Sequence, residues 1–249
     1  MIRRARPLLG TLVAISADGP AAGVDAAFAA IEEVQRLMSA QRAGSDIGRI
    51  NRHALRSSVE VHPWTFAVLE RAAAISRQTG GAFDVVAGAR HTDLVLEPNR
   101  VRLRRPARVD VSGIAKGFAV DLAVDLLRAG GATSGSVNAG GDLRFFGAWS
   151  GPVRVRSPAA PQRAVCLPAS PHQAFATSCG YFGSSIHDSR TGACSTLDWS
   201  VTVAAATCLV ADALTKAVAL VGPQRSLLDA FGALAYAVDR DGALHAAAG

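Results

Sequence analysis

Four short segments of the sequence combine glycine with charged or polar side chains, a combination typical of sites that bind phosphates or metal ions. The first reads D-V-S-G-I-A-K-G over residues 110–117, where a predicted strand precedes a helix. A helix start offers unpaired amides and a positive dipole end, which favour a phosphate. Gly113 would admit a ligand close to the backbone, and Lys116 would add a cation. A capped helix with a surface lysine explains the same residues, so both interpretations stay open.

The second segment lies in an apolar stretch with helical periodicity and reads A-D-A-L-T-K over residues 211–216. Residues three and four apart share one helix face, so Asp212, Thr215 and Lys216 point to a common side. A carboxylate beside a hydroxyl can hold a hard cation. An Asp–Lys pair within the helix explains the pattern more simply and is favoured by periodicity alone.

The other two segments are G-G-A-F-D at residues 80–84 and H-D-S-R-T-G at residues 187–192. Phe83 and Asp84 follow two glycines at a predicted helix end and could grip a planar ligand, although Phe83 could equally belong to the core. Asp188 is predicted to bond its own backbone in an ordinary polar turn. The six scattered histidines do not assemble a Ser-His-Asp triad.

The elements that must position these segments follow from hydrophobic periodicity. Apolar residues recur every three or four positions in the predicted helices, which cover residues 20–40, 63–78, 116–128 and 209–221. Alternating patterns predict strands over residues 12–16, 94–103 (a hairpin), 108–111, 134–138, 143–146, 199–206 and 234–238, with proline-interrupted strands between 153 and 177 and a last pairing with 243–247. The elements lack regular βαβ alternation, which favours an α+β fold over a doubly wound sheet.

Length, charge and cysteine content exclude several classes of protein. The 249 residues suffice for one large domain or two small lobes, and we take 1–249 as a single domain. The net charge of +6 includes basic clusters at residues 3–6 and 100–108, but these lack interleaved aromatics and a binding module, so no nucleic-acid partner is predicted. The four cysteines form no C-x-x-C pair, which argues against a zinc site and suggests reduced thiols.

The N-terminal residues favour a cytoplasmic location. No stretch of about 18 uninterrupted apolar residues exists, so no membrane span is predicted. The apolar run after the first arginines is too short and broken for a signal peptide, and no lipobox cysteine follows it. A different start site would change this expectation, so a periplasmic form stays open.

Taken together, the order and spacing of the segments resemble the ApbE family of FAD:protein FMN transferases. The resemblance runs from Leu9 to about Gly222. Its most specific parts are D-x-x-G-x-A-K-G and N-A-G-G-D, followed later by A-D-A-L. The supporting segments are L-G-T (9–11), S-D-I-G-R-I-N (45–51), T-G-G-A-F-D (79–84), D-V-S-G-I-A-K-G-F-A-V-D (110–121), N-A-G-G-D (138–142), D-S-R-T-G (188–192) and A-D-A-L (211–214).

The resemblance implies an α+β fold of mixed sheets and flanking helices, with a flavin site between two lobes. It implies transfer of FMN from FAD to a threonine or serine of a target protein, with release of AMP. Such phosphoryl-type transfer depends mostly on positioning and charge neutralisation. A divalent cation, usually Mg²⁺, would assist by bridging the diphosphate of FAD.

The resemblance also assigns roles to individual residues. Lys116 and Asp212 are implied to be catalytic. The metal would be held by the Gly113 carbonyl and Asp212, with Thr215 one position before the usual ligating threonine. Leu9 replaces a cofactor-touching methionine, and Gln41 replaces an aromatic that often stacks on the flavin. The residues implied to contact FAD are Leu9, Gln41, Ala82, Phe83, Asp84, Asp110, Lys116 and Ser185.

Three positions depart from the family pattern. Lys216 stands at the position of the usual metal-ligating threonine, and we hypothesise that its ammonium substitutes partly for the metal ion. Ser185 stands where many members carry histidine; His187 lies two residues later, displaced by about 6–7 Å along an extended segment. Cys179 replaces a usual glycine.

Three other functions stay open, and the departures at Lys216 and Ser185 favour the first of them. A flavin-binding protein that has lost the transfer reaction would release no AMP from FAD. An FAD pyrophosphatase would use water as the acceptor and leave no modified protein. A basic interaction protein unrelated to flavin would fail to bind FAD under any condition.

Overall fold

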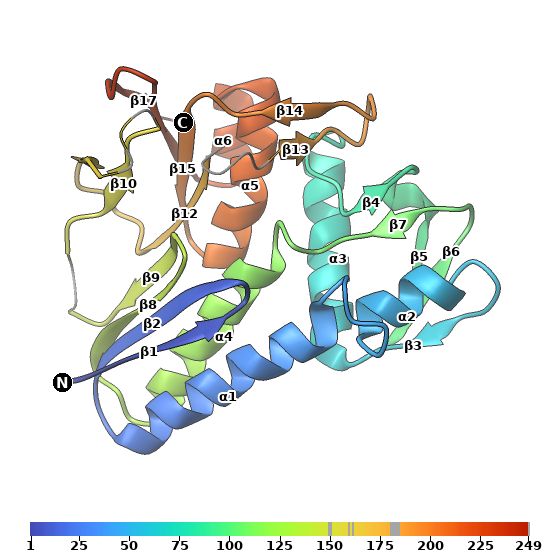
Figure 1. Cartoon of the computed structure of the whole chain (residues 1–249), viewed down its shortest axis with the longest axis horizontal. Coiled ribbons are helices and arrows are strands. Elements are labelled where there is room, and N and C mark those ends of the chain that lie inside the picture. The colour runs from blue at the N-terminus through green and yellow to red at the C-terminus, as the bar shows by residue number, and fades with distance from the viewer. Residues whose placement is uncertain (149–150, 159, 161, 180–184, 249) are drawn as a thin grey trace.

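The computed structural model describes residues 1–148, 151–158, 160, 162–179 and 185–248. Its largest element is an eight-stranded sheet in the order β1-β2-β8-β9-β12-β15-β16-β17 (Figure 1). The strand pairings among the described residues are antiparallel, which confirms the predicted α+β class. The strands are β1 (Ile2–Leu8), β2 (Thr11–Asp18), β8 (Ser134–Ala139), β9 (Asp142–Phe146), β12 (Ala174–Cys179), β15 (Ser200–Ala205), β16 (Leu234–Val238) and β17 (Leu244–Ala248).

Three helices cover one face of this sheet: α1 (Ala21–Met38), α4 (Ala115–Ala129) and α5 (Cys208–Val221). Helix α4 packs on β8 and β9, α5 packs on β12 and β15, and α1 packs on α4. The apolar residues whose spacing predicts α1 also form its buried face. They include Val24, Ala27, Phe28, Ile31 and Val34.

A second group of elements lies beside the large sheet, at the right of Figure 1. Apolar residues of this group belong to the same hydrophobic core as those of the large sheet, so the two groups share one interior. The group contains the helices α2 (Asp46–His53) and α3 (Pro63–Gln78), the 3₁₀ turn η1 (His91–Asp93), a three-stranded sheet of β3 (Val59–Glu60), β6 (Arg100–Leu103) and β5 (Leu94–Glu97), and the pair β4 (Val86–Ala87) and β7 (Arg108–Val109).

The opposite face of the large sheet carries a smaller apolar cluster that includes Phe175 and Tyr236. The pair β10 (Arg154–Arg156) and β11 (Ala164–Cys166) covers it through Val155. The remaining described elements are the hairpin of β13 (Ser185–His187) and β14 (Cys194–Thr196) and the short helix α6 (Arg225–Ala230).

Most elements match their sequence prediction, and the exceptions have local causes. Helix α3 has the predicted bounds, with Pro63 in its first turn, and β16 pairs with β17 as expected. The elements that the sequence did not predict are β1, β3, β4, β13, β14, α2, α6 and η1. Arginines dominate β1 and polar residues dominate α2, so neither shows the apolar periodicity on which the prediction relied.

The basic clusters are paired with acidic residues of neighbouring elements. Arg4 lies 2.6 Å from Asp25 and Arg6 lies 3.4 Å from Glu32, so the acids of α1 face the arginines of β1. In the second cluster, Arg105 lies 3.0 Å from Asp93. These clusters therefore behave as solvated strand edges. Among the described residues, no helix has the length and apolar character that crossing a membrane requires.

Candidate functional site

Two tight hairpin turns bring polar segments together at the end of the large sheet. Leu9 and Gly10 connect β1 to β2, and both have positive φ angles, which suits a two-residue turn. The Leu9 amide donates a 2.5 Å hydrogen bond to Gln35 of α1, which anchors this turn. Gly140 and Gly141 likewise connect β8 to β9 with φ angles of 65° and 109°, a conformation that glycine adopts readily. The second turn delivers Asp142 to the start of β9.

The junction between β7 and α4 is held from the second group of elements. The side-chain amide of Asn51 in α2 donates to the Val109 carbonyl over 2.9 Å and accepts from the Val109 amide over 2.7 Å. Asp110 follows directly and accepts a hydrogen bond from the Ser112 amide over 2.9 Å. Helix α4 then begins at Ala115, so Lys116 lies in its first turn, as the sequence predicts.

Helices α4 and α5 touch at a glycine, and this contact joins distant parts of the sequence. A Cβ atom at Gly117 would lie 2.3 Å from the carbonyl oxygen of Cys208, so only glycine fits. Asp121, one turn further along α4, accepts hydrogen bonds from the Cys208 and Leu209 amides and so caps the start of α5. The two helices are thereby fixed so that Lys116 faces Asp212.

Lys116, Asp142, Asp212 and Lys216 form a cluster of two buried carboxylates and two half-buried ammonium groups, here called the lysine–aspartate cluster. The Lys116 Nζ lies 2.5 Å from Asp142 Oδ2 and 3.5 Å from Asp212 Oδ2. Lys216 donates to the other oxygen of Asp212, Oδ1. The Gly117 amide also donates to Asp212 Oδ2 over 3.2 Å. Both oxygens of the fully buried Asp212 carboxylate therefore have cationic partners.

Burial and the neighbouring charges shift the pKa values of the two carboxyl groups in opposite directions. Burial acts to raise the pKa of Asp212, but Lys116 and Lys216 outweigh it and lower that pKa to about 2. Burial, reinforced by repulsion from Asp212, raises the pKa of Asp142 to about 6 despite the neighbouring Lys116. Burial also acts to lower the pKa of Lys116, yet Asp212 and Asp142 hold it above its ordinary value. Asp212 is thus a fixed anion, and Lys116 stays protonated.

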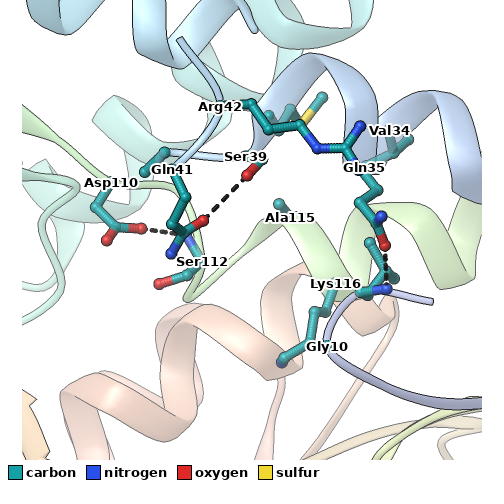
Figure 2. A pocket seen from close by; sticks show the side chains of 13 residues that line it. Gly10, Val34, Gln35, Ser39, Gln41, Arg42, Asp110, Ser112, Ala115 and Lys116 are labelled. Atoms are coloured by element: carbon teal, nitrogen blue, oxygen red, sulfur yellow. Dashed lines mark hydrogen bonds between the residues drawn. The ribbon is translucent and has the colours of Figure 1, made fainter. Parts of the chain in front are cut away.

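A cavity of about 390 Å³ opens beside this cluster, and Lys116 belongs to both. Figure 2 shows Gln41, Asp110 and Ser112 at the left of the cavity, Gln35 at the right and Lys116 below. The cavity is lined by residues from the β1–β2 turn, from the end of α1 with the loop after it, and from the β7–α4 junction. These residues are Leu9, Gly10, Val34, Gln35, Met38, Ser39, Ala40, Gln41, Arg42, Asp110, Ser112, Ala115 and Lys116.

The cavity gathers four of the predicted FAD-contacting residues: Leu9, Gln41, Asp110 and Lys116. Sequence reasoning missed Gln35 and Arg42, which line the same cavity. Asp142 belongs to the N-A-G-G-D motif but had no predicted site role, although it accepts a hydrogen bond from Lys116. The position of Arg42 beside Gln41 in a polar loop is the signal that could have suggested the arginine, whereas Gln35 lies within the predicted helix.

The residues predicted to contact FAD at positions 82–84 are not among those that line the cavity. Phe83 is buried, and its ring lies 3.6 Å from the place of a Cβ atom at Gly113. The buried Asp84 carboxylate accepts hydrogen bonds from the Val86 and His91 amides, each over 2.9 Å. Ala82 is buried in the same turn. Their contact with FAD stays a prediction, and the role visible in the structure is to shape the turn beneath Gly113.

The segments 187–192 and 80–84, both singled out in the sequence, meet at the turn that follows α3. The Ser189 hydroxyl donates to the Gly81 carbonyl over 3.1 Å, so the loop after β13 rests on the segment that carries Phe83. Asp188 accepts from the Arg190 amide over 2.9 Å, as predicted for a self-bonded polar turn. The side chains of Ser185 and His187 lie outside the described residues. Cys179 ends β12, opposite Ser200.

The residues predicted to hold a metal ion form a donor set that does not suit a divalent cation in this arrangement. Lys216 is an ammonium group and cannot ligate a metal. The Thr215 hydroxyl donates to the Asp212 carbonyl over 2.7 Å and lies 2.7 Å from the Ser178 hydroxyl. Within the described part of the chain, no group of three or more His, Cys, Asp or Glu side chains could hold a metal ion.

Comparisons with known proteins agree with this architecture. The chain is 28% identical over 244 residues to the FAD:protein FMN transferase of Vibrio cholerae, covering 79% of this chain and 72% of that protein. It is 30% identical over 192 residues to the protein of the same name from Treponema pallidum, covering 61% of this chain and 53% of that protein, about half of its length.

Among solved structures, the ApbE protein of Thermotoga maritima has a TM-score of 0.84 at 24% identity, covering 99% of this chain and 96% of that one. The flavin transferase ApbE of Vibrio cholerae has a TM-score of 0.83 at 24% identity, with the same coverage. These likenesses show the fold. The sequence model of the ApbE family matches residues 9–235, most of the chain, and we conclude that the chain belongs to the ApbE family.

Proposed function

We propose that this chain is an FAD:protein FMN transferase, which moves FMN from FAD to a threonine or serine of a target protein and releases AMP. The observation that carries the proposal is the position of Lys116, a residue that lines the cavity and whose ammonium lies against two buried carboxylates. The names of the two relatives, both FAD:protein FMN transferases, support the same reaction.

The reaction forms one phosphoester bond and breaks one bond of the diphosphate. The hydroxyl oxygen of the acceptor attacks the flavin-side phosphorus of FAD, and the proton of that hydroxyl passes to water. The bond from that phosphorus to the bridging oxygen breaks, and AMP departs with the bridging oxygen. Negative charge grows on the diphosphate oxygens, so a fixed cation beside them lowers the barrier.

Within this reaction, we assign Lys116 to the diphosphate and Asp212 to the positioning of Lys116. Lys116 lines the cavity and stays protonated, so it can stabilise the growing charge. Asp212 is buried, and its pKa is lowered to about 2, which makes it a poor proton acceptor and a firm partner for the ammonium groups.

The flavin part of FAD is proposed to contact Leu9 and Gln41, which lie at the cavity, with Asp110 beside them. Contacts from Ala82, Phe83, Asp84 and Ser185 complete the predicted set. The family resemblance implies assistance by Mg²⁺, but the donor set around Asp212 does not favour a metal ion, so no step is assigned to one. Residues 1–249 are proposed to act as one domain, in line with the core shared by both groups of elements.

The experiment that tests this function follows FAD turnover by the purified chain, with a peptide that carries an acceptor threonine and a matched peptide with alanine in its place. AMP release together with the mass gain of FMN on the threonine peptide alone is the expected result. AMP release without a modified peptide would identify an FAD pyrophosphatase. FAD binding without AMP release would identify a flavin-binding protein.

A Lys116→Met variant connects the reaction to the cluster. Loss of a fixed cation from a charge-stabilising site is expected to slow AMP release by about 100-fold. Arg225→Met serves as the matched control, because Arg225 is an exposed cation on α6, and it should keep normal turnover. Circular dichroism of both variants would show whether folding is retained. Normal turnover by Lys116→Met would contradict the assigned role.

A further inference from the structure

The chain contains only two lysines, and both lie at the same carboxylate. Lys116 and Lys216 bond opposite oxygens of Asp212. Lysine and arginine together number 26 in the sequence, and all of them except these two are arginines. An ammonium is a compact point charge, whereas a guanidinium is a planar fork. The two positions that face Asp212 therefore carry the cation whose size and charge density come closest to those of a metal ion.

The side chain of Lys216 runs along the loop that precedes α4. Its Cε atom lies 3.3 Å from the place of a Cβ atom at Gly113, so the aliphatic stem passes directly beside this glycine. The side chain is 22% exposed, whereas the Asp212 carboxylate beneath it is fully buried. An ammonium has three N–H donors, and the bond to Asp212 uses one of them. The others are available to an anion that approaches the loop.

The charge of the cluster argues against a divalent cation at the same place. The two carboxylates of Asp142 and Asp212 are balanced by the two ammonium groups, so the cluster is neutral when all four are ionised. A Mg²⁺ ion prefers carboxylate oxygens and gives up its water reluctantly. To reach Asp212 it would have to displace Lys216 and then remain beside Lys116.

We propose that the Lys216 ammonium takes the place of the divalent cation, so that this chain binds the diphosphate of its dinucleotide without a metal ion. Asp212 holds the ammonium in place, as it would hold a metal. The identity of the dinucleotide as FAD rests on the proposed function, but the occupation of the cation position by Lys216 does not.

FAD binding with and without metal tests the proposal. Flavin fluorescence would report the FAD affinity of the wild-type chain in EDTA and in excess Mg²⁺, and we expect the two values to agree within about twofold. Lys216→Met keeps the aliphatic stem beside Gly113 but removes the charge, and its affinity in EDTA should fall by about tenfold or more. Lys216→Arg keeps the charge, so it should recover part of this loss.

Arg225→Met again controls for the loss of one positive charge and should bind FAD as the wild type does. Two results would overturn the proposal. One is a wild-type affinity that drops tenfold or more when Mg²⁺ is removed, and the other is unchanged binding by Lys216→Met in EDTA. A Lys216→Met variant that does not fold would leave the wild-type comparison and Lys216→Arg to decide.

A metal-binding measurement separates this proposal from the proposed function, because it needs no flavin. Electron paramagnetic resonance of Mn²⁺ would be followed in the wild type, in Lys216→Thr and in the double variant Lys216→Thr/Asp212→Asn. We expect saturable Mn²⁺ binding only in Lys216→Thr. Equal binding by the wild type and Lys216→Thr, or binding by neither, would overturn the role of Lys216. Failure of every variant to bind FAD would overturn the proposed function alone.

Discussion

At the scale of single residues, the site depends on how a few side chains share buried charge. Asp212 accepts from two ammonium groups and one backbone amide, which accounts for a carboxylate with no exposed surface. Asp142 contributes the second anion, and Lys116 connects both to the cavity. Removing Lys116 leaves the buried Asp142 carboxylate without its cation, and removing Asp212 leaves Lys216 without its carboxylate.

A pH titration of stability examines Asp212 directly. Its pKa is lowered from an ordinary value of 3.8 to about 2, so its charged form stabilises the fold above pH 4 and that contribution is lost as the pH falls towards 2. The contribution is about 2 kcal/mol. The difference in unfolding free energy between the wild type and Asp212→Asn, measured by urea denaturation in EDTA, should therefore shrink below pH 4. A difference that stays constant from pH 7 to pH 2 would contradict this assignment.

Substitution of Gln41 is expected to strengthen FAD binding. Gln41 lies in the cavity lining, at the position where the family often has an aromatic that stacks on the flavin. Replacing it by tyrosine should add stacking worth about 0.5–1.5 kcal/mol and so tighten FAD binding by about twofold to twelvefold. Flavin fluorescence measures the change, and Gln224→Tyr on the loop before α6 provides a control. Weaker binding by Gln41→Tyr would show that the flavin does not lie against this position.

At the scale of elements, the site is built where helix ends and strand turns meet. The start of α5 is capped by Asp121 of α4, and the β1–β2 turn is anchored to α1 through Gln35. The junction after β7 is held by Asn51 of α2. Each anchor is a side chain that satisfies backbone groups of another element, so the site geometry depends on residues outside the cavity.

Gly117 lies at the contact between α4 and α5, where substitution is expected to be costly. A Cβ atom there would lie 2.3 Å from the Cys208 carbonyl, so Gly117→Ala must push α4 and α5 apart. We expect a loss of about 1–3 kcal/mol in unfolding free energy, measured by chemical denaturation. Gly44→Ala is the matched control, because a Cβ atom at Gly44 would meet no atom within 4 Å. Equal stability of the two variants would contradict the close helix contact.

At the scale of the whole molecule, the cavity collects its lining from separate regions of the fold. The β1–β2 turn belongs to the large sheet, and the β7–α4 junction follows a strand of the second group. The loop after α1 completes the lining and leads into α2 (Figure 1). A ligand in this cavity therefore contacts parts of the chain that must be folded together.

FAD should consequently stabilise the entire fold. At a concentration of about 100 times its dissociation constant, it should raise the unfolding free energy by about 2.7 kcal/mol. Thermal unfolding followed by circular dichroism would show this as a higher midpoint, whereas riboflavin, which has no phosphate, should shift the midpoint less. An unchanged midpoint with saturating FAD would argue against binding at this cavity.

The sequence by itself determined the helices and strands whose apolar residues repeat at a regular spacing, including the bounds of α3 and the β5–β6 hairpin. It also determined that Asp212, Thr215 and Lys216 share one helix face, because that relation is local. Only the tertiary structure decided that Lys116 meets Asp142, 26 residues away, and Asp212, 96 residues away. The contact of α4 with α5 at Gly117 and the turn before β9 create these meetings, and such long-range contacts leave no periodic signal in the sequence.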